Sequence, residues 1–231
     1  MSNLKTMTTM EQRTIEWQRA RLGKFTGSRV ADLMTKSRTK GETFGATAMS
    51  YIRKVAAQRM LNPMLIEDDE LFCDYLDLTT ATSKVMRWGT EQEDEAKRLY
   101  INVTKNKVID VASVEMNEMP YFAASPDGVV VEQAHNGTLG VLEIKCSLDE
   151  RFVEFCQVED GESLKAAEPK YYWQVMSEMA VTGYGFCDFV VYNPWMRHPL
   201  HVARITRDED AIAEMLERVR LANDVVESLI A

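Results

Sequence analysis

The sequence predicts an α/β (α+β) fold, in which short β-strands and amphipathic helices share one chain. Two runs rich in β-branched residues, 129–131 and 141–144, flank Asn136-Gly137, a dipeptide typical of a hairpin turn. Apolar residues at helical spacing predict a helix over 169–182, which Gly183 ends. Two further β-rich runs, 186–192 and 200–205, follow that helix. A strand pair, a helix and a second strand pair together indicate a sheet covered by helices.

The N-terminal half is predicted to be mainly helical. Its apolar residues recur every three or four positions between polar breaks. In chain order we expect a flexible end over about 1–14, a helix capped by Ser28 and running through Met34, a mobile loop over 37–47, a helix over 50–61 that Asn62-Pro63 ends, a solvated acidic connection over 67–70, and a helix over 82–103.

The C-terminal half is predicted to contain most of the strands. In chain order we expect a strand over 108–116, the hairpin, a short helix and a loop over 148–168, the helix 169–182, the two strands 186–192 and 200–205, and a helix reaching Ile230 that begins at the capping box Thr206-x-x-Glu209. We find no internal repeat and no linker, so we expect residues 1–231 to form one domain.

The composition limits the class of protein. The chain has 231 residues, of which 45% are hydrophobic, and this is enough for one domain with a substantial core. Its formal net charge of −9 argues mildly against nucleic-acid binding, which usually needs a basic surface. Net charge does not report local charge, however, and a basic groove can lie on an acidic body.

The four cysteines are scattered and form no C-x-x-C motif. They are therefore interpreted as reduced thiols, as in a cytosolic protein. We also find no signal peptide, polybasic tail or 18-residue apolar run. A soluble intracellular protein without a membrane partner is expected.

Asp127, Glu143 and Lys145 are the strongest candidates for a catalytic site. Asp127 precedes the first hairpin strand, and Glu143 and Lys145 lie two residues apart on the second strand, on one face. The hairpin return should bring that face close to Asp127. Two carboxylates suit Mg²⁺ or Mn²⁺, and a lysine beside a metal can hold or deprotonate a water or stabilise developing charge. The alternative is a surface hairpin with solvated charges.

Three other groups of residues are weaker candidates. Ser28 at a helix start and Arg21 close to it could bind a phosphate, or they could belong to an ordinary capped helix with a surface arginine. Glu93 lies one turn past Gly89 and could turn a carboxylate inward from an otherwise solvated charge run. His198 and His201 could form a metal pair, although solvated side chains are the simpler interpretation.

The motifs, taken in order, resemble those of lambda exonuclease and its relatives, the YqaJ-type phage recombination exonucleases of the PD-(D/E)xK nuclease superfamily. The resemblance covers about residues 17 to 192. It rests on Trp17-x-x-x-Arg21-Leu-Gly-x-x-Thr26-x-Ser28, Trp88-Gly-x-x-x-Glu93, Ser125-Pro-Asp127-Gly, Leu142-Glu-Ile-Lys-Cys146 and Gln174-Val. Each motif is weak alone, and the five together in this order are specific.

The resemblance implies a restriction-endonuclease-like core, with a central mixed β-sheet flanked by helices. It also implies an Mg²⁺-dependent enzyme, with Mn²⁺ as a substitute, that digests one strand of linear double-stranded DNA from its 5′-phosphorylated end and leaves a 3′ overhang for strand-annealing recombination. The implied roles are Asp127, Glu143, Glu93 and the backbone carbonyl of Ile144 at the metal, Lys145 as catalytic lysine, Arg21, Ser28, Ser125 and Gln174 at the 5′-phosphate, and Met86 as the wedge that separates the strands.

The resemblance further implies partners: DNA ends, two more copies of the chain in a homotrimeric ring, and a single-strand annealing protein, in the cytoplasm of a bacterium that carries the phage or prophage. A ring needs positive charge only along its channel, for which Arg38, Lys40, Arg53 and Lys54 are candidates, although they could equally serve surface solubility. Two alternatives stay open: a catalytically inactive module that binds DNA ends, and an endonuclease of the same fold.

Overall fold

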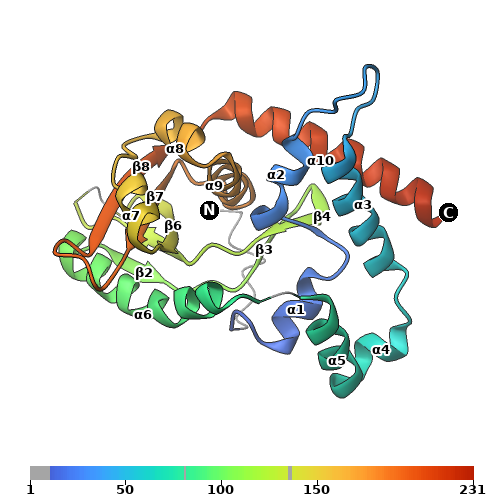
Figure 1. The fold of residues 1–231 in the computed structure, drawn as a ribbon, viewed down its shortest axis with the longest axis horizontal. Coiled ribbons are helices and arrows are strands. Elements are labelled where there is room, and N and C mark those ends of the chain that lie inside the picture. Colours follow the sequence, from blue (N-terminus) through green and yellow to red (C-terminus); the bar gives the residue numbers. More distant parts are fainter. Residues whose placement is uncertain (1–10, 81, 135–136) are drawn as a thin grey trace.

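The computed structural model describes residues 11–80, 82–134 and 137–231 (Figure 1). Residues 1–10 of the expected flexible end and Asn136 of the expected turn lie outside the described residues. The described strands form two sheets, one of five strands and one of three. Helices cover both sheets, so the predicted combination of a mixed sheet and flanking helices is confirmed.

The five-stranded sheet carries the predicted hairpin. Its strands, in spatial order, are β2 (Lys107–Ile109), β5 (Gly128–Val131), β6 (Leu139–Cys146), β7 (Phe186–Tyr192) and β8 (Leu200–Thr206). β6 and β7 are parallel, and the other neighbouring pairs are antiparallel. The two halves of the predicted hairpin pair as expected, with Val129 opposite Val141.

The three-stranded sheet corrects one prediction. Its strands, in spatial order, are β1 (Phe25–Thr26), β4 (Met119–Ala124) and β3 (Val114–Met116). The single strand expected over 108–116 is wrong, because β2 pairs with β5 in one sheet and β3 pairs with β4 in the other. The segment 110–113 therefore passes from one sheet to the other.

The N-terminal helices differ from prediction mainly at their starts. They are α1 (Ile15–Arg21), the 3₁₀ helix η2 (Gly27–Arg29), α2 (Ala31–Met34), α3 (Ala46–Arg59), α4 (Pro63–Glu67), α5 (Asp69–Thr79) and α6 (Lys84–Thr104). Ser28 does not cap a helix, because it lies inside η2, and Val30 is the N-cap of α2 without a side-chain bond. The acidic connection is also not a loop, because Asp68 caps α5 through the backbone N–H of Leu71.

The C-terminal helices are α7 (Asp149–Phe155), α8 (Gly161–Ala167), α9 (Pro169–Thr182) and α10 (Glu209–Ile230). α9 matches its prediction, and Gly183 ends it in the left-handed conformation at φ 75°. The predicted capping box at Thr206 is wrong, because Thr206 is the final residue of β8 and Asp208 caps α10 through the N–H of Ala211.

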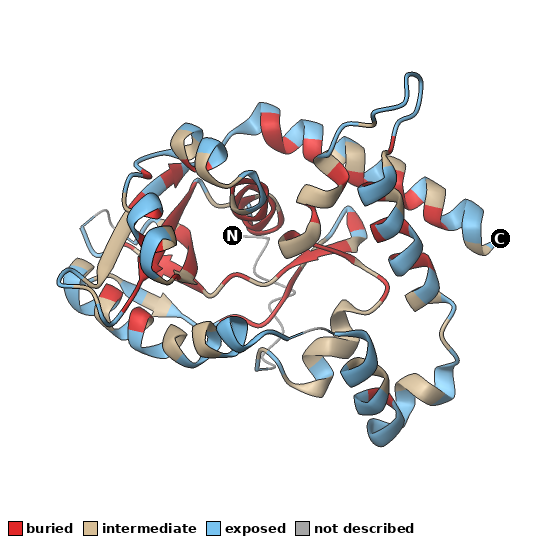
Figure 2. Cartoon of the chain, viewed as in Figure 1, coloured by how far each residue is buried: buried red, intermediate tan, exposed pale blue. Residues whose placement is uncertain are grey.

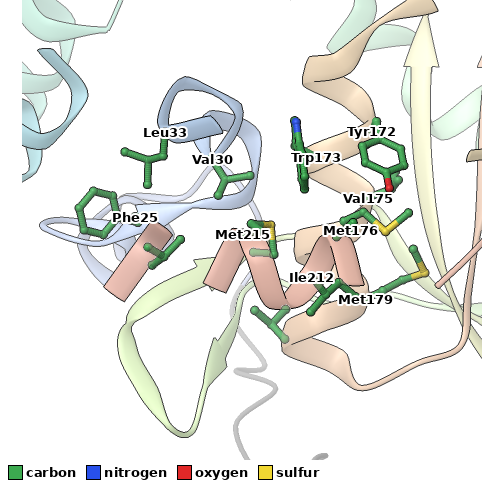
Figure 3. Close-up of a cluster of buried hydrophobic side chains, with 14 of the residues drawn as sticks. Phe25, Val30, Leu33, Tyr172, Trp173, Val175, Met176, Met179, Ile212 and Met215 are labelled. Carbon is green, nitrogen blue, oxygen red and sulfur yellow. The ribbon is translucent and has the colours of Figure 1, made fainter. Parts of the chain in front are cut away.

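Helix α9 runs through the middle of the molecule and is buried on nearly every side (Figures 1 and 2). In the close-up of the core, side chains of α9 face Val30 and Leu33 of the N-terminal region and Ile212 and Met215 of α10 (Figure 3). α9 thus packs against the part of the molecule that carries the catalytic candidates. None of the described helices combines the length and the apolar character that a membrane span requires.

Candidate active site

The hairpin brings Asp127 to the second strand by backbone hydrogen bonds. Gly128 pairs with Leu142, and the N–H of Asp127 donates to the carbonyl of Leu142 at 3.0 Å. The N–H of Ile144 in turn donates to Oδ2 of Asp127 at 2.7 Å. The carboxylate is therefore held against the strand that carries Glu143 and Lys145, as the sequence predicts.

Lys145 and Gln174 close a hydrogen-bonded cluster around Glu143. The ammonium group of Lys145 donates to Oε1 of Glu143 and, at 3.3 Å, to Oε1 of Gln174. Nε2 of Gln174 donates to Glu143 Oε1 at 2.6 Å and to Glu178 Oε1 at 3.1 Å. Lys145 also lies 4.7 Å above the ring of Tyr171. Helix α9 therefore supplies one wall of the site and β6 the other.

Burial dominates the electrostatics of this cluster. Glu143 is 2% exposed and Glu178 is 1% exposed. Burial, with the nearby charge of Asp127, raises the pKa of Glu143 to about 7 although Lys145 opposes the shift, and burial beside Glu143 raises the pKa of Glu178 well above its usual range. Burial alone would lower the pKa of Lys145, but attraction to Glu143 and Asp127 outweighs it and raises that pKa. The neighbouring carboxylates therefore favour the protonated form of Lys145.

Glu93 joins the site through an unexpected partner. Nη2 of Arg13 donates to Oε2 of Glu93 at 2.5 Å. Burial and the proximity of Asp127 raise the pKa of Glu93, and Arg13 opposes the shift. The neighbouring Gln12 fixes this segment, because its Nε2 donates to the carbonyls of Val111 and Pro126 at 2.9 and 2.8 Å. Residues 11–14, expected to be flexible, thus make defined contacts beside Asp127.

The donor atoms fit a hard divalent cation. Oε2 of Glu143 is buried and has no hydrogen-bond partner among the described residues, and Asp127 lies beside it on the same hairpin. No three described His, Cys, Asp or Glu side chains already converge as ligands, and Glu93 is bonded to Arg13. Mg²⁺ commonly takes one or two carboxylates and completes its shell with water. Asp127, Glu143 and the Ile144 carbonyl could supply such a set.

Arg21 and Ser125 meet next to this cluster. Nη1 of Arg21 donates to Oγ of Ser125 at 2.6 Å, and the indole N–H of Trp17 donates to the same oxygen at 3.2 Å. The Arg21 guanidinium stacks on Trp17 at 4.1 Å, and burial lowers the pKa of Arg21 to about 10. Because Ser125 is two residues before Asp127, these groups lie close to the carboxylate site.

Arg21 also lines a cavity of about 130 Å³ together with Lys24, Arg29 and Lys54. Lys24 pairs with Glu115 and Arg29 with Asp32, and no carboxylate is among the described residues that line the cavity. The opening is large enough for a phosphate group, and its charge suits one. Lys54, a candidate channel residue, is exposed and lines this cavity together with Arg21.

The other predicted residues do not all lie where the sequence analysis expects them. Ser28 is half-buried in η2 and supplies no helix cap, and Gln174 lies with Glu143 and Lys145 rather than with Arg21. Met86 is 58% exposed in the first turn of α6, where a wedge would be accessible. His201 bonds the carbonyl of Val158 through Nε2 at 2.7 Å, so its side chain already has a structural partner.

Sequence reasoning missed Glu178 and Arg13. Glu178 lies one turn after Gln174, and the polar positions 174, 177 and 178 interrupt an otherwise apolar helix, a signal that could have identified it. Arg13 carries no comparable signal, because its partner Glu93 is 80 residues away in the sequence.

Comparison with known proteins places this geometry in a known family. The sequence model of the YqaJ-like viral recombinase domain matches residues 16–185. An alkaline exonuclease from Laribacter hongkongensis, solved alone and in complex with dAMP, has a similar structure at 32% identity, with a TM-score of 0.71 over 94% of both chains. A phage-related exonuclease from Haemophilus somnus 129PT, at 18% identity, shares the fold with a TM-score of 0.62 over 90% of this chain and 95% of its own. Comparison with curated proteins gives no match.

The matched region contains every predicted catalytic and phosphate-binding residue, from Arg21 to Gln174. It also includes the hairpin and α9, the two elements that build the carboxylate cluster. The fold agreement extends over nearly the whole of the Laribacter protein. The chain belongs to the YqaJ-like viral recombinase domain family.

Proposed function

We propose that this protein is an Mg²⁺-dependent 5′→3′ exonuclease that digests one strand of linear double-stranded DNA. The observation that carries the proposal is the juxtaposition of the Asp127–Glu143–Lys145 cluster with Arg21 and Ser125. The groups proposed for hydrolysis thus lie close to the group proposed for phosphate binding. The exonuclease names of the relatives support the same class of reaction.

Each residue has a distinct part in the proposed reaction. Asp127, Glu143 and the Ile144 carbonyl hold Mg²⁺, which would polarise the scissile phosphate and acidify a water. Lys145, kept protonated by its carboxylate neighbours, orients the attacking water and stabilises charge on the phosphate oxygens. Attack on phosphorus breaks the P–O3′ bond, so the shortened strand again begins with a 5′-phosphate.

Arg21 is proposed to bind that terminal 5′-phosphate. Its guanidinium can turn from Ser125 to the phosphate, and the cations around the adjacent cavity strengthen the attraction. Ser125 and the nearby Ser28 can donate hydroxyl groups, while Gln174 acts through Glu143 and Lys145. Glu93 would complete the metal and water network once released from Arg13.

At the level of assembly, we propose a homotrimeric ring around the duplex, with Met86 separating the strands and Arg38, Lys40 and Arg53 facing the DNA. The 3′ overhang would pass to a single-strand annealing protein for recombination, in the cytoplasm of a bacterial host. An acidic exterior on such a ring would disfavour side-on binding to DNA, in agreement with the net charge of −9.

The first test is digestion of linear duplexes that carry 5′-phosphate or 5′-hydroxyl ends, with closed and nicked circles as further substrates, in Mg²⁺ or EDTA. We expect Mg²⁺-dependent loss of the 5′-phosphorylated strand and intact closed circles. Asp127→Ala and Glu143→Ala should retain the fold and keep less than about a hundredth of the activity, since each removes an anionic ligand. Leu229→Ala, an exposed change on α10, is the control.

Arg21→Ala tests the end recognition separately. Because hydrogen bonds to charged groups contribute about 1.5–3 kcal/mol, we expect the rate of digestion from 5′-phosphorylated ends to fall by about tenfold to a hundredfold. The variant should no longer prefer 5′-phosphate ends over 5′-hydroxyl ends. Cleavage of closed circles would instead support an endonuclease. Binding of ends without hydrolysis at any Mg²⁺ concentration would support the inactive binding module.

A further inference from the structure

An exposed aromatic pair lies at the same sheet edge as Lys145. The rings of Trp88, on α6, and Trp195, in the β7–β8 connection, stack with centroids 5.1 Å apart and planes at 21°. Trp195 is nevertheless 69% exposed. One indole is therefore covered by its partner while most of the other faces solvent.

The pair is held in place by the backbone around it. The buried side chain of Asn193 accepts from the N–H of Trp195 at 3.1 Å, and the N–H of Asn193 donates to the carbonyl of Pro199 at 2.9 Å. The β7–β8 connection is thus a closed turn, and it lies beside α6 (Figure 1). The exposed indole is preorganised, which lowers the entropic cost of stacking a ligand on it.

Two contacts place the tryptophan pair close to the proposed catalytic residues. On α6, a Cβ placed at Gly89, the neighbour of Trp88, would lie 3.7 Å from the carbonyl of Cys146, which follows Lys145. On β7, Tyr192 lies three residues before Trp195, and its carbonyl accepts from the N–H of Ser147 at 3.0 Å. Both indoles therefore lie near the carboxyl ends of β6 and β7, the end of the sheet that carries Lys145.

The charges around the pair favour a nucleic acid over another protein surface. Lys84 and Arg87 precede Trp88 in the first turn of α6, and Arg197 follows Trp195. All three are exposed, and in the described part of the chain none forms an ion pair with a carboxylate. Aromatic faces flanked by cations are the pattern that binds single strands without sequence preference.

We propose that Trp195, backed by Trp88, is a stacking platform for unpaired nucleotides of single-stranded DNA. This inference deepens the proposed exonuclease function and rests on it for the identity of the strand. Lys84, Arg87 and Arg197 contact the phosphates that link the stacked bases. The platform keeps a separated strand end from re-pairing while Met86, two residues before Trp88, stands at the fork.

The test is binding of a fluorescein-labelled twelve-residue oligo(dT) in EDTA, measured by anisotropy. Trp195→Ala should weaken binding about tenfold, the size of one lost base stack, while Trp195→Phe retains most of the affinity. Leu229→Ala, in the last turn of α10, is the control for loss of an exposed apolar side chain. Binding of a blunt duplex should change less than about twofold in Trp195→Ala. Thermal melting confirms that each variant is folded.

Duplexes with a twelve-nucleotide unpaired 5′ or 3′ tail then identify the strand, and a Trp195→Ala penalty on either tail supports the platform. Equal oligo(dT) binding by wild type and Trp195→Ala would overturn the platform. A change in self-association of Trp195→Ala would also overturn it, because the tryptophan pair would then be a contact between copies of the chain. If wild type hydrolyses no DNA but loses oligo(dT) binding with Trp195→Ala, the proposed function fails and the platform stands. If wild type is an active nuclease and Trp195→Ala binds normally, only the platform fails.

Discussion

In the Lys145 cluster, a single ammonium group lies among several buried carboxyl groups. Asp127, Glu143 and Glu178 all have raised pKa values because burial disfavours their charged forms. Lys145 can compensate about one negative charge, so without a metal the remaining acids are most stable when protonated. The metal-free cluster is thus adapted to accept further positive charge.

The first prediction concerns the pH dependence of stability. The pKa of Glu143 in the folded protein is about 7, above its ordinary 4.5, so its contribution is fully present below pH 4.5 and is lost as the pH rises through 7. In EDTA, the free energy of unfolding should fall by about 1–3 kcal/mol over this window, and Glu143→Gln should reduce the fall. Urea unfolding at successive pH values measures it, with the exposed Glu214→Gln as control. An identical pH profile for Glu143→Gln and wild type would contradict the assignment.

The second prediction concerns Lys145. Lys145→Ala should lower the single-turnover rate at least about a hundredfold with little change in the Kd for DNA, because the charge acts on the transition state. Lys145→Arg should not rescue it, since the space between Glu143, Gln174 and the Tyr171 ring fits an ammonium group. The exposed Lys107→Ala controls for loss of one positive charge. An active arginine variant would show that positive charge alone is sufficient.

At the residue scale, sequence reasoning found Asp127, Glu143 and Lys145 because a hairpin fixes their relation: the strand period puts Glu143 and Lys145 on one face, and the turn brings Asp127 back to them. It placed Gln174 with the phosphate group, whereas the side chain lies against Glu143. Side-chain direction on α9 depends on how the helix is rotated against β6, and local spacing contains no information on that rotation.

At the scale of elements, local signals predicted a segment well when its partner was close in the sequence. A turn signal joins the two strands of the hairpin, and Gly183 marks the end of α9. The strand expected over 108–116 failed because its two halves pair with different strands, β5 and β4. The helix at Ser28 failed because Thr26 pairs with β4, so the chain leaves a strand directly into the turn η2.

The third prediction concerns the contact between η2 and α9. A Cβ at Gly27 would lie 2.3 Å from Oγ of Ser177 and 3.2 Å from Cβ of Ala124. Gly27→Ala should therefore destabilise the protein by about 1–3 kcal/mol through overpacking. Ser177→Ala should recover most of that loss in the double variant, because it removes the nearest atom. Urea unfolding of the four proteins in a double-mutant cycle gives the coupling, and additive costs would show that the two residues do not meet.

At the scale of the whole molecule, stability and activity depend on different surfaces. Met215, Val219 and Val226 of α10 are fully buried in the main core, away from the Lys145 cluster. The sequence predicted α10 from its periodicity, yet it could not reveal that α10 packs on α9 and on α3, which lies about 150 residues earlier in the chain. Long-range packing of this kind is set by the whole fold.

The fourth prediction is that Met215→Ala lowers stability while leaving catalysis intact. Truncating this buried side chain should cost about 2–5 kcal/mol, which lowers Tm by about 5–15 °C in a protein of this size. The kcat/KM for DNA at 25 °C should stay within about twofold of wild type, since the site lies on β6 and α9. Calorimetry and strand digestion measure the two quantities. A large loss of kcat/KM in the folded variant would show that α10 positions the catalytic groups.

Helix α10 follows every described strand in the chain, and this order affects the newly made protein. Arg218 donates through Nε to the carbonyl of Leu33 at 2.5 Å, and Arg59 pairs with Glu227 at 2.6 Å, so α10 joins segments nearly two hundred residues apart. Until α10 leaves the ribosome, both sheets can be present while the apolar surface it covers stays open to chaperones and to neighbouring chains. At about 5–20 residues per second, synthesis of its 22 residues takes about one to four seconds. During that interval the nascent chain is most exposed to aggregation.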